Sequence, residues 1–470
     1  MINLLHFFLL CLLSFSTCVT AKSLPAPQDS RSFFIDSAQL PFADFPIPGI
    51  ETEKYWGELK GAGYRIEVPT NWNGELVMWA HGFLGNGEQL FVENHPLRLF
   101  LISQGFAWAA SSYTKNFYDV RSGVQSTNDL VRFFKENIAE PNRVFISGVS
   151  MGGHITAAAI EQFPNYQCPQ GSHRVLCKRI VKLLGRISGG VKYSGAVPVC
   201  GVMADREGLI YGVNYRLVAE QLAGLNNQFP TSADYTLTTL PQVIARLFAD
   251  NGEGYPHTVS PQGEKLKDYL RYSTGGARPV FDLAFGDFQD TVFASGLGNG
   301  TLDGITGGNL YDNLLAVYQL DGDPTLSAEE QALNAAMLRV ALDPQADPER
   351  FLKLERIPIL TGRLSVPVVT LHTLGDLRVP FSNQQIYYHR AAAKGRSNFL
   401  VQRAIRDIGH CTFEDNELIE AFVDMYQWAT NGIKPEGDDI ITPDVVSDKD
   451  YGCKFTRRTR SELGIDACPQ

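Results

Sequence analysis

The sequence predicts an α/β fold with a mostly parallel central sheet, helices on both faces and a large inserted cap. The first observation is that short apolar runs alternate with amphipathic helical patterns from about residue 60, as in parallel sheets that are covered on both faces. The second is that this alternation stops after Cys200 and resumes only at Val366. Residues 205–355 therefore interrupt one large α/β domain.

The expected strands are short apolar runs, and the expected helices show apolar side chains at helical spacing. The strands lie at residues 64–68, 76–80, 106–111, 144–147, 196–200 and, after the interruption, 366–371. The helices lie at residues 96–104, around 127–138, from the capping box at Ser327 toward Leu342, and at 415–430.

The first 21 residues have the features of a secretory signal peptide. Their apolar run continues to Leu13, which is too short for a membrane span, and the residues before Lys22 suit cleavage after Ala21. No Lys or Arg precedes the run, which leaves an uncleaved anchor or lipid attachment at Cys18 as alternatives. We expect cleavage and export to an extracellular or periplasmic location, with no membrane span in the mature chain.

The mature chain is predicted to consist of an α/β domain, residues 22–204 and 356–470, and a cap, residues 205–355. The formal net charge of −10 argues against a nucleic acid partner. Several glycines between Gly296 and Gly308 predict either a mobile lid or an irregular surface loop.

The cap also contains closely spaced phenylalanines, which either line an apolar pocket or form the core of the cap itself. They are Phe281, Phe285, Phe288 and Phe293.

Two of the eight cysteines, Cys11 and Cys18, leave with the signal peptide, and the remaining six suggest three disulfides in an exported chain. The sequence alone does not assign the connectivity. Proximity favours Cys168 with Cys177, Cys453 with Cys468, and Cys200 with Cys411 as a long-range pair. The spacings do not match a zinc site, so no metal is expected. Asn299 begins a glycosylation sequon, which is meaningful only in a eukaryotic host.

The segment Gly148–Gly152 predicts a nucleophile elbow, a sharp turn between a strand and a helix that exposes a serine. An apolar run precedes it, and a helical pattern follows it. Glycine at both ends of the segment removes side chains that would collide with neighbouring backbone in so sharp a turn. Ser150 is therefore the candidate nucleophile.

A serine hydroxyl is a weak nucleophile and needs a base within hydrogen-bond distance, with a third group to orient that base. Downstream of Ser150, Asp376 lies in the loop after the expected strand at 366–371, and His410 lies just before the last helix. Asp407 is the rival acid, although it lies only three residues before His410 and we place it on the preceding strand or loop.

With these residues identified, the chain resembles the α/β-hydrolase superfamily, which uses the chain order nucleophile, acid, histidine. The resemblance covers about residues 60–205 and 360–432. It implies that Ser150, Asp376 and His410 are the nucleophile, the acid and the base.

The segment His81-Gly82-Phe83 follows an expected strand and resembles the oxyanion loop of lipases and esterases. The resemblance implies that the backbone amides of Phe83 and Met151 form the oxyanion hole, which stabilises the negative charge of a tetrahedral intermediate. In such loops, His81 usually braces the turn and transfers no proton. We assign His154, His372 and His389 to structural roles in the same way.

The His410-Cys411 step is similar to that of exported esterases of the tannase and feruloyl-esterase group, and more loosely the chain resembles prolyl-oligopeptidase-like hydrolases. In the tannase group a disulfide ties the histidine loop to a cysteine just before the serine. This chain has Val149 at that position, so Cys411 must pair elsewhere, and Cys200 is the candidate.

The leading hypothesis is a secreted serine hydrolase that cleaves carboxylic esters of small-molecule or polymer-derived substrates without a cofactor. A serine peptidase or amidase of the same fold is the enzymatic alternative, because amide cleavage uses the same three residues. A non-catalytic binding protein of the same fold would typically have a damaged triad or oxyanion loop, and here all of those positions are intact. The segment at Gly296–Gly300 lacks the spacing of a dinucleotide-binding motif.

Overall fold

A computed structural model describes residues 31–162, 190–250, 257–287, 308–344 and 354–469, together with residues 293, 300, 305, 306 and 346. Several expectations lie outside these residues. They are the signal peptide at 1–21, the pair Cys168–Cys177, the sequon at Asn299, Phe288, and most of the glycine cluster between Gly296 and Gly308.

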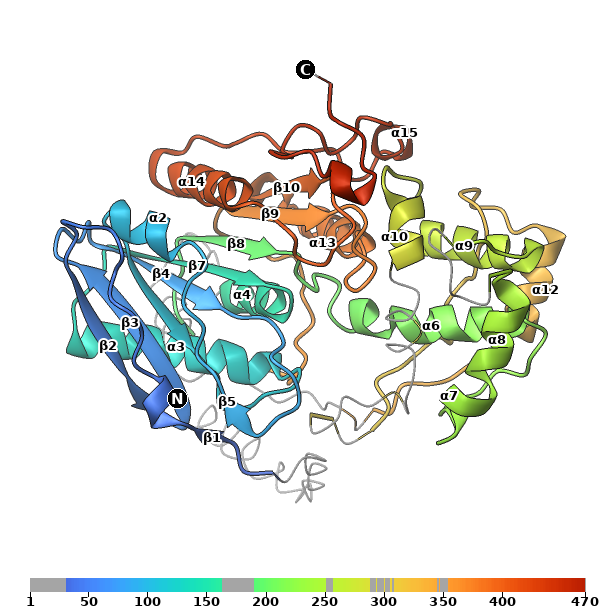
Figure 1. Ribbon diagram of the computed structural model, residues 1–470, viewed down its shortest axis with the longest axis horizontal. Helices are drawn as coiled ribbons and strands as arrows, with labels where there is room; N and C mark the ends of the chain where they lie inside the picture. Colours follow the sequence, from blue (N-terminus) through green and yellow to red (C-terminus); the bar gives the residue numbers. More distant parts are fainter. Residues whose placement is uncertain are drawn as a thin grey trace, which may run out of the picture.

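One sheet of eight strands forms the centre of the molecule, in the order β10-β9-β8-β7-β4-β6-β3-β2 (Figure 1). Only the pairings of β3 with β2 and with β6 are antiparallel in this sheet, which confirms the mostly parallel arrangement. Along the chain the strands are β2 (Thr52–Leu59), β3 (Ala62–Pro69), β4 (Glu75–Ala80), β6 (Ala107–Ser111), β7 (Arg143–Val149), β8 (Gly195–Val199), β9 (Val368–Thr373) and β10 (Leu400–Ile405). Strands β1 (Phe34–Ile35) and β5 (Gln89–Leu90) pair separately.

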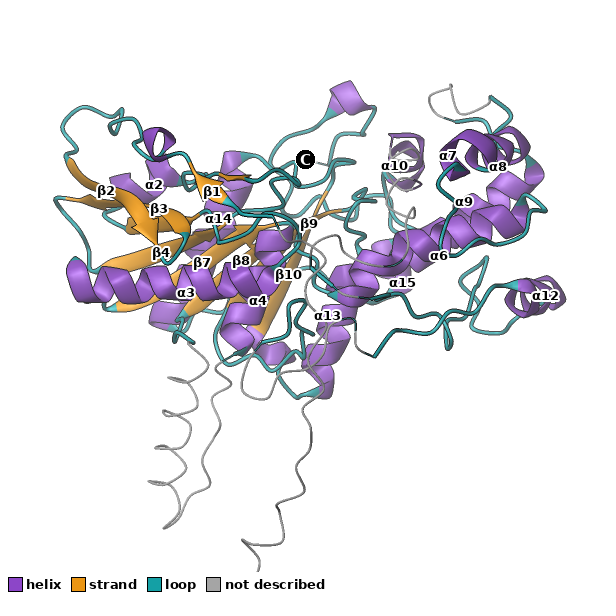
Figure 2. Cartoon of the chain, turned by 90° about the horizontal axis from the view of Figure 1, so that it is seen from below, coloured by secondary structure: helices purple, strands orange, loops and turns teal. Residues whose placement is uncertain are grey.

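Helices cover both faces of the sheet (Figure 2). One face carries α3 (Val120–Asn137), α4 (Met151–Glu161) and α13 (Ser382–Ala393), and the other carries α2 (Arg98–Ser103) and α14 (Asp415–Asn431). Every residue of β4 and of β9 is buried, because a parallel strand between two helical layers meets no water.

Two strands of the eight-stranded sheet were not among those expected from the sequence. Strand β2 lies at the edge of the sheet and alternates partly buried with exposed residues, so it has no apolar run. Strand β10 contains two buried polar residues whose partners come from other elements. Gln402 donates to the backbone oxygen of Gln384 at 2.9 Å, and Arg403 pairs with Asp424 of α14.

Two helix boundaries also differ from the expectation. Helix α3 begins at Val120, where the side chain of Asp119 caps it by accepting from the amide of Ser122. Helix α12 (Ala328–Ala336) begins at the expected capping box but ends well before Leu342. The chain turns extended at Met337, and the amide of Val340 then donates to the side chain of Asn313 at 2.7 Å.

The described residues between β8 and β9 form a group of helices beside the sheet (Figure 1). Its apolar core contains Phe281, Phe285 and Phe293, each about 2% exposed, so these rings pack inside the group. The same core includes Leu377 and Ile408, which lie in the loops after β9 and β10. The helices are α6 (Arg206–Leu222), α7 (Tyr235–Thr238), α8 (Leu240–Leu247), α9 (Pro261–Ser273), α10 (Phe281–Asp287) and α12.

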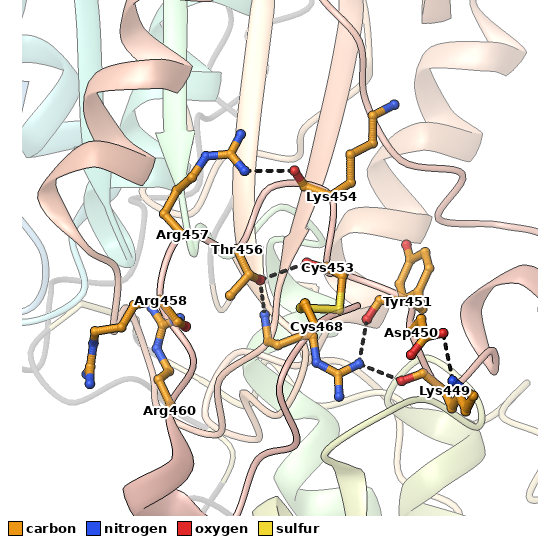
Figure 3. Close-up of a disulfide and its surroundings, with 12 residues drawn as sticks. Lys449, Asp450, Tyr451, Cys453, Lys454, Thr456, Arg457, Arg458, Arg460 and Cys468 are labelled. Carbon is orange, nitrogen blue, oxygen red and sulfur yellow. Dashed lines mark hydrogen bonds and ion pairs between the residues drawn. A yellow bond between two sulfur atoms is a disulfide. The ribbon is translucent and has the colours of Figure 1, made fainter. Parts of the chain in front are cut away.

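The chain ends in a tail that packs against the end of the sheet near β10 and contains α15 (Pro443–Val446) (Figure 1). A disulfide between Cys453 and Cys468 closes a loop in this tail (Figure 3). Across the described ranges, no helix combines the length and the apolar character needed to cross a bilayer.

Candidate active site

Ser150 occupies a strained turn between β7 and α4. Its backbone has φ 56° and ψ −120°, which a residue with a side chain rarely adopts. A Cβ on Gly148 would lie 2.3 Å from the carbonyl oxygen of Gly152, and a Cβ on Gly152 would lie 1.9 Å from that of Ala80. Backbone atoms therefore exclude any side chain at both positions, as the elbow hypothesis requires.

The structure brings the three predicted side chains together at the carboxyl ends of the strands. The Oγ of Ser150 lies 2.9 Å from Nε2 of His410, and Nδ1 of His410 lies 2.6 Å from Oδ2 of Asp376. The other oxygen of Asp376 accepts from the amides of Arg378 at 2.9 Å and Val379 at 2.8 Å. These contacts assign the ring proton to Nδ1 and leave Nε2 free to accept the serine proton.

Asp407, the rival acid, faces a different partner. One of its carboxylate oxygens accepts from the amide of Gly409 at 2.7 Å, and the other pairs with the guanidinium of Arg460. The buried carboxylate that contacts the imidazole of His410 is therefore that of Asp376.

The loop after β4 lies against the elbow. A Cβ on Gly82 would lie 3.4 Å from Cβ of Ser150, so the loop that contains Gly82 passes close to the serine that precedes α4. His81 stacks on Tyr113 with ring centroids 3.9 Å apart, and burial lowers the pKa of His81 to about 4. His81 is thus neutral and supports the loop.

Two of the other histidines, His154 and His372, have contacts that suit structural roles. Nε2 of His154 lies 2.8 Å from the carbonyl oxygen of Pro358, and burial lowers the pKa of His154 to about 4. His372 likewise donates from Nε2 to the carbonyl oxygen of Val379 at 2.8 Å, and burial lowers its pKa. His389 lies on the exposed side of α13.

A disulfide joins Cys200, at the end of β8, to Cys411, next to His410. The Cα atoms are 5.4 Å apart, and Sγ of Cys411 lies 3.2 Å from Nε2 of His410. Both cysteines have positive φ, 42° and 63°, so the bond links two turns whose backbone is itself constrained. The tail disulfide, Cys453–Cys468, is also present as expected.

An apolar cavity of about 180 Å³ is lined by residues that neighbour Ser150 and His410 in the chain. Its walls include Val149, which precedes Ser150, and Cys411, which follows His410. Other apolar walls come from Trp79, Leu97, Val197, Phe413, Leu418 and Phe422. A cavity of about 150 Å³ in another protein holds benzene, so this one has room for a ring or a short branched chain.

Two arginines that sequence reasoning missed support the loops of the site. Arg278, between α9 and α10, donates from Nε to the carbonyl oxygen of Leu374 at 2.6 Å, and burial lowers the pKa of Arg278 to about 9. Arg460 lies in the tail and pairs with Asp407. Neither carries a local sequence signal, because each partner is far away along the chain. Among the described residues, no group of three His, Cys, Asp or Glu side chains is arranged to hold a metal ion.

No family model matches the chain. It is similar to an o-phthalyl amidase from Xanthobacter agilis, with 23% identity over 440 residues that cover 83% of this chain and 90% of that protein. Among solved structures it is similar to feruloyl esterase B from Aspergillus oryzae, with 13% identity, coverage of 84% and 85% of the two chains, and a TM-score of 0.44. It is also similar to an esterase from Pyrococcus furiosus, with 12% identity, coverage of 86% and 96%, and a TM-score of 0.36.

The fold can be identified from the geometry of the chain itself. A mostly parallel sheet between two helical layers carries Ser150 on a glycine-flanked elbow, and the acid and the histidine follow in the loops after two later strands. That combination of architecture and chain order shows that the protein has the α/β-hydrolase fold.

Proposed function

We propose that this protein is a serine hydrolase that cleaves carboxylic esters, with Ser150 as the nucleophile, His410 as the general base and Asp376 as the residue that orients the imidazole. The observation that carries the proposal is the unbroken line of contacts from Asp376 through His410 to Ser150, at 2.6 Å and 2.9 Å. A non-catalytic protein of this fold has no need to maintain that line at a strained serine.

In the proposed reaction, Ser150 Oγ attacks the acyl carbon while His410 Nε2 takes the serine proton. The carboxylate of Asp376 stabilises the imidazolium that forms, and the amides of Phe83 and Met151 stabilise the oxyanion. The tetrahedral intermediate then collapses: the bond from the acyl carbon to the leaving oxygen breaks, His410 gives its proton to that oxygen, and the acyl group remains on Ser150. Water, activated by the same imidazole, releases the acid and restores the serine.

The acyl group of the substrate is proposed to enter the apolar cavity beside Val149 and Cys411. Its volume of about 180 Å³ favours a benzoyl-sized or short branched acyl group over a long chain. The remainder of the substrate would lie toward the helices at residues 205–355, which we propose act as the cap.

Amide cleavage is the second candidate, and the similarity to an o-phthalyl amidase over most of both chains favours it. The same residues serve both reactions, but an amide needs stronger protonation of its leaving nitrogen. An o-phthalyl amide is therefore the amide substrate to test.

The test compares the wild-type protein with Ser150→Ala on nitrophenyl esters of rising acyl length, on nitrophenyl benzoate and on an o-phthalyl amide. We expect hydrolysis of short and benzoyl esters by the wild type and a loss of at least about 10³-fold in S150A. A fluorophosphonate probe should label the wild type and leave S150A unlabelled. Equal hydrolysis and equal labelling of the two proteins would refute the proposal, and turnover of the amide alone would select the second candidate.

Export of the chain is part of the same proposal. The two disulfides support it, because such bonds persist in oxidising compartments. Amino-terminal sequencing of the protein recovered outside the cell should begin at Lys22 if the expected signal peptide is removed.

A further inference from the structure

We propose that Arg460 is a positioning residue, through which the disulfide-closed tail loop holds His410 in place for the reaction. The inference rests on the proposed function and adds a residue that does not touch the reacting atoms. Its basis is a set of contacts between this tail arginine and both sides of the histidine loop, residues 407–412.

Arg460 is almost fully buried, with about 2% of its side chain exposed, and its guanidinium meets the histidine loop on two sides. Before His410, its Nε pairs with Asp407. After His410, its Nη2 donates to the carbonyl oxygen of Thr412 at 3.3 Å and to Glu417, at the start of α14, at 3.1 Å. One rigid, planar cation thus spans the segment that carries His410.

Asp407 also contacts the residues next to His410 and Asp376. The carboxylate of Asp407 accepts from the amide of Gly409, next to His410, at 2.7 Å. The carbonyl oxygen of Asp407 accepts from the amide of Gly375, next to Asp376, at 2.8 Å. A displacement of Asp407 would therefore change the position of both His410 and Asp376.

Two features of the tail loop fix the position of Arg460 beside the histidine loop. The disulfide Cys453–Cys468 closes the loop around it (Figure 3). Within the loop, Oγ1 of Thr456 accepts from the amide of Arg406 at 2.9 Å, which fastens the loop to the end of β10. Asp407 and Glu417 are both buried, so removal of the arginine would leave two carboxylates without this cation.

Arg458 offers a matched control in the same loop. It also pairs with two carboxylates, Glu414 and Glu462, but half of its side chain is exposed, and no hydrogen bond or ion pair joins that side chain to residues 407–412, all of which the structure describes. An exposed pair contributes little, so its loss should leave the histidine loop unchanged.

The experiment compares Arg460→Lys, Arg460→Gln and Arg458→Gln in the full-length oxidised protein. Lysine keeps the positive charge but cannot contact Asp407, Thr412 and Glu417 at the same time. Arg460→Lys is included so that the inference can still be tested if Arg460→Gln does not fold. Hydrogen exchange of the peptide that covers residues 407–413 reports the loop directly, and steady-state kinetics on the ester substrate reports its consequence. Thermal unfolding shows whether each variant is folded.

For Arg460→Lys we expect faster exchange in that peptide, a fall in kcat of about 10- to 100-fold and a KM within about twofold of the wild type. Arg458→Gln should match the wild type in both measurements. Exchange and kcat in R460K that equal those of R458Q would overturn the inference.

The exchange measurement separates the two proposals. If the wild type shows no hydrolysis that depends on Ser150, the proposed function fails. Faster exchange at 407–413 in R460K would then still support the structural part of the inference, and unchanged exchange would overturn it.

Discussion

At the scale of single residues, the geometry around Ser150 depends on backbone atoms that come from two strands. Gly152 faces the carbonyl oxygens of Ala80 and His81, and Gly148 faces Gly152 itself. The strand β4 therefore comes so close to the elbow that its last residue and the start of α4 are in direct backbone contact. This close approach also brings the candidate oxyanion loop to the serine.

Gly152→Ala should damage both stability and activity. The new Cβ would lie 1.9 Å from the oxygen of Ala80, so the end of β4 or the elbow must move. We expect a loss of about 1–3 kcal/mol in the free energy of unfolding, measured by urea denaturation, with a large fall in ester hydrolysis.

Gly87→Ala is the matched control, because a Cβ at this loop glycine would meet no atom within 4 Å. Its free energy of unfolding should stay within about 0.5 kcal/mol of the wild type. If the two variants behave alike, the close contact at Gly152 does not determine the elbow.

At the scale of elements, the disulfide Cys200–Cys411 connects the end of β8 to the loop between β10 and α14. The sequence separation of the two cysteines is 211, so the bond removes many conformations from the unfolded chain. In the folded chain it lies against the imidazole of His410. The bond therefore has a role in stability and a role in the geometry of the site.

Replacement of both cysteines by serine should lower kcat and also destabilise the fold. The chain-entropy model gives a loss of about 5 kcal/mol for so long a loop, and about 3 kcal/mol for the loop closed by Cys453–Cys468. Urea denaturation of the two double variants tests that order, and ester hydrolysis at a urea concentration below the transition tests the effect on the site. An unchanged kcat in C200S/C411S would show that the bond does not hold the histidine loop.

At the scale of the whole molecule, several histidines are buried in neutral form. His95 is an example, since its Nε2 contacts Oγ of Ser147 at 2.9 Å, its Nδ1 accepts from the amide of Leu97, and burial lowers its pKa to about 3. His81 and His154 have pKa values lowered to about 4 for the same reason. Protonation of any of them favours the unfolded chain.

The stability should therefore fall in acid. Above about pH 6.5 His95 is neutral in both states and contributes no pH dependence, whereas between about pH 6.5 and 3 only the unfolded chain binds its proton. Between pH 5.5 and 4, the free energy of unfolding of the wild type should fall by about 1.4 kcal/mol per pH unit more than that of His95→Asn. Urea denaturation across this range measures the difference, and parallel curves for the two proteins would contradict it.

Local sequence patterns were enough to predict most strands of the central sheet and the candidate catalytic residues. Alternating apolar runs identified the parallel strands, and Ser150 between Gly148 and Gly152 identified the elbow, because each of these signals lies within a few consecutive residues. Asp376 could be predicted because it follows an expected strand, whereas His410 was identified by its place before the last helix and by the chain order that the resemblance implies.

Only the tertiary structure decided which groups meet across long distances in the chain. In the folded chain, Asp376 contacts the imidazole of His410, and Asp407 forms an ion pair with Arg460. Arg278 donates to the backbone of the loop that contains Asp376. Strand β10 shows the same limit, because its polar residues are stable in the sheet only through partners on other elements. Such contacts depend on how whole elements pack together, so the spacing of residues along the chain does not predict them.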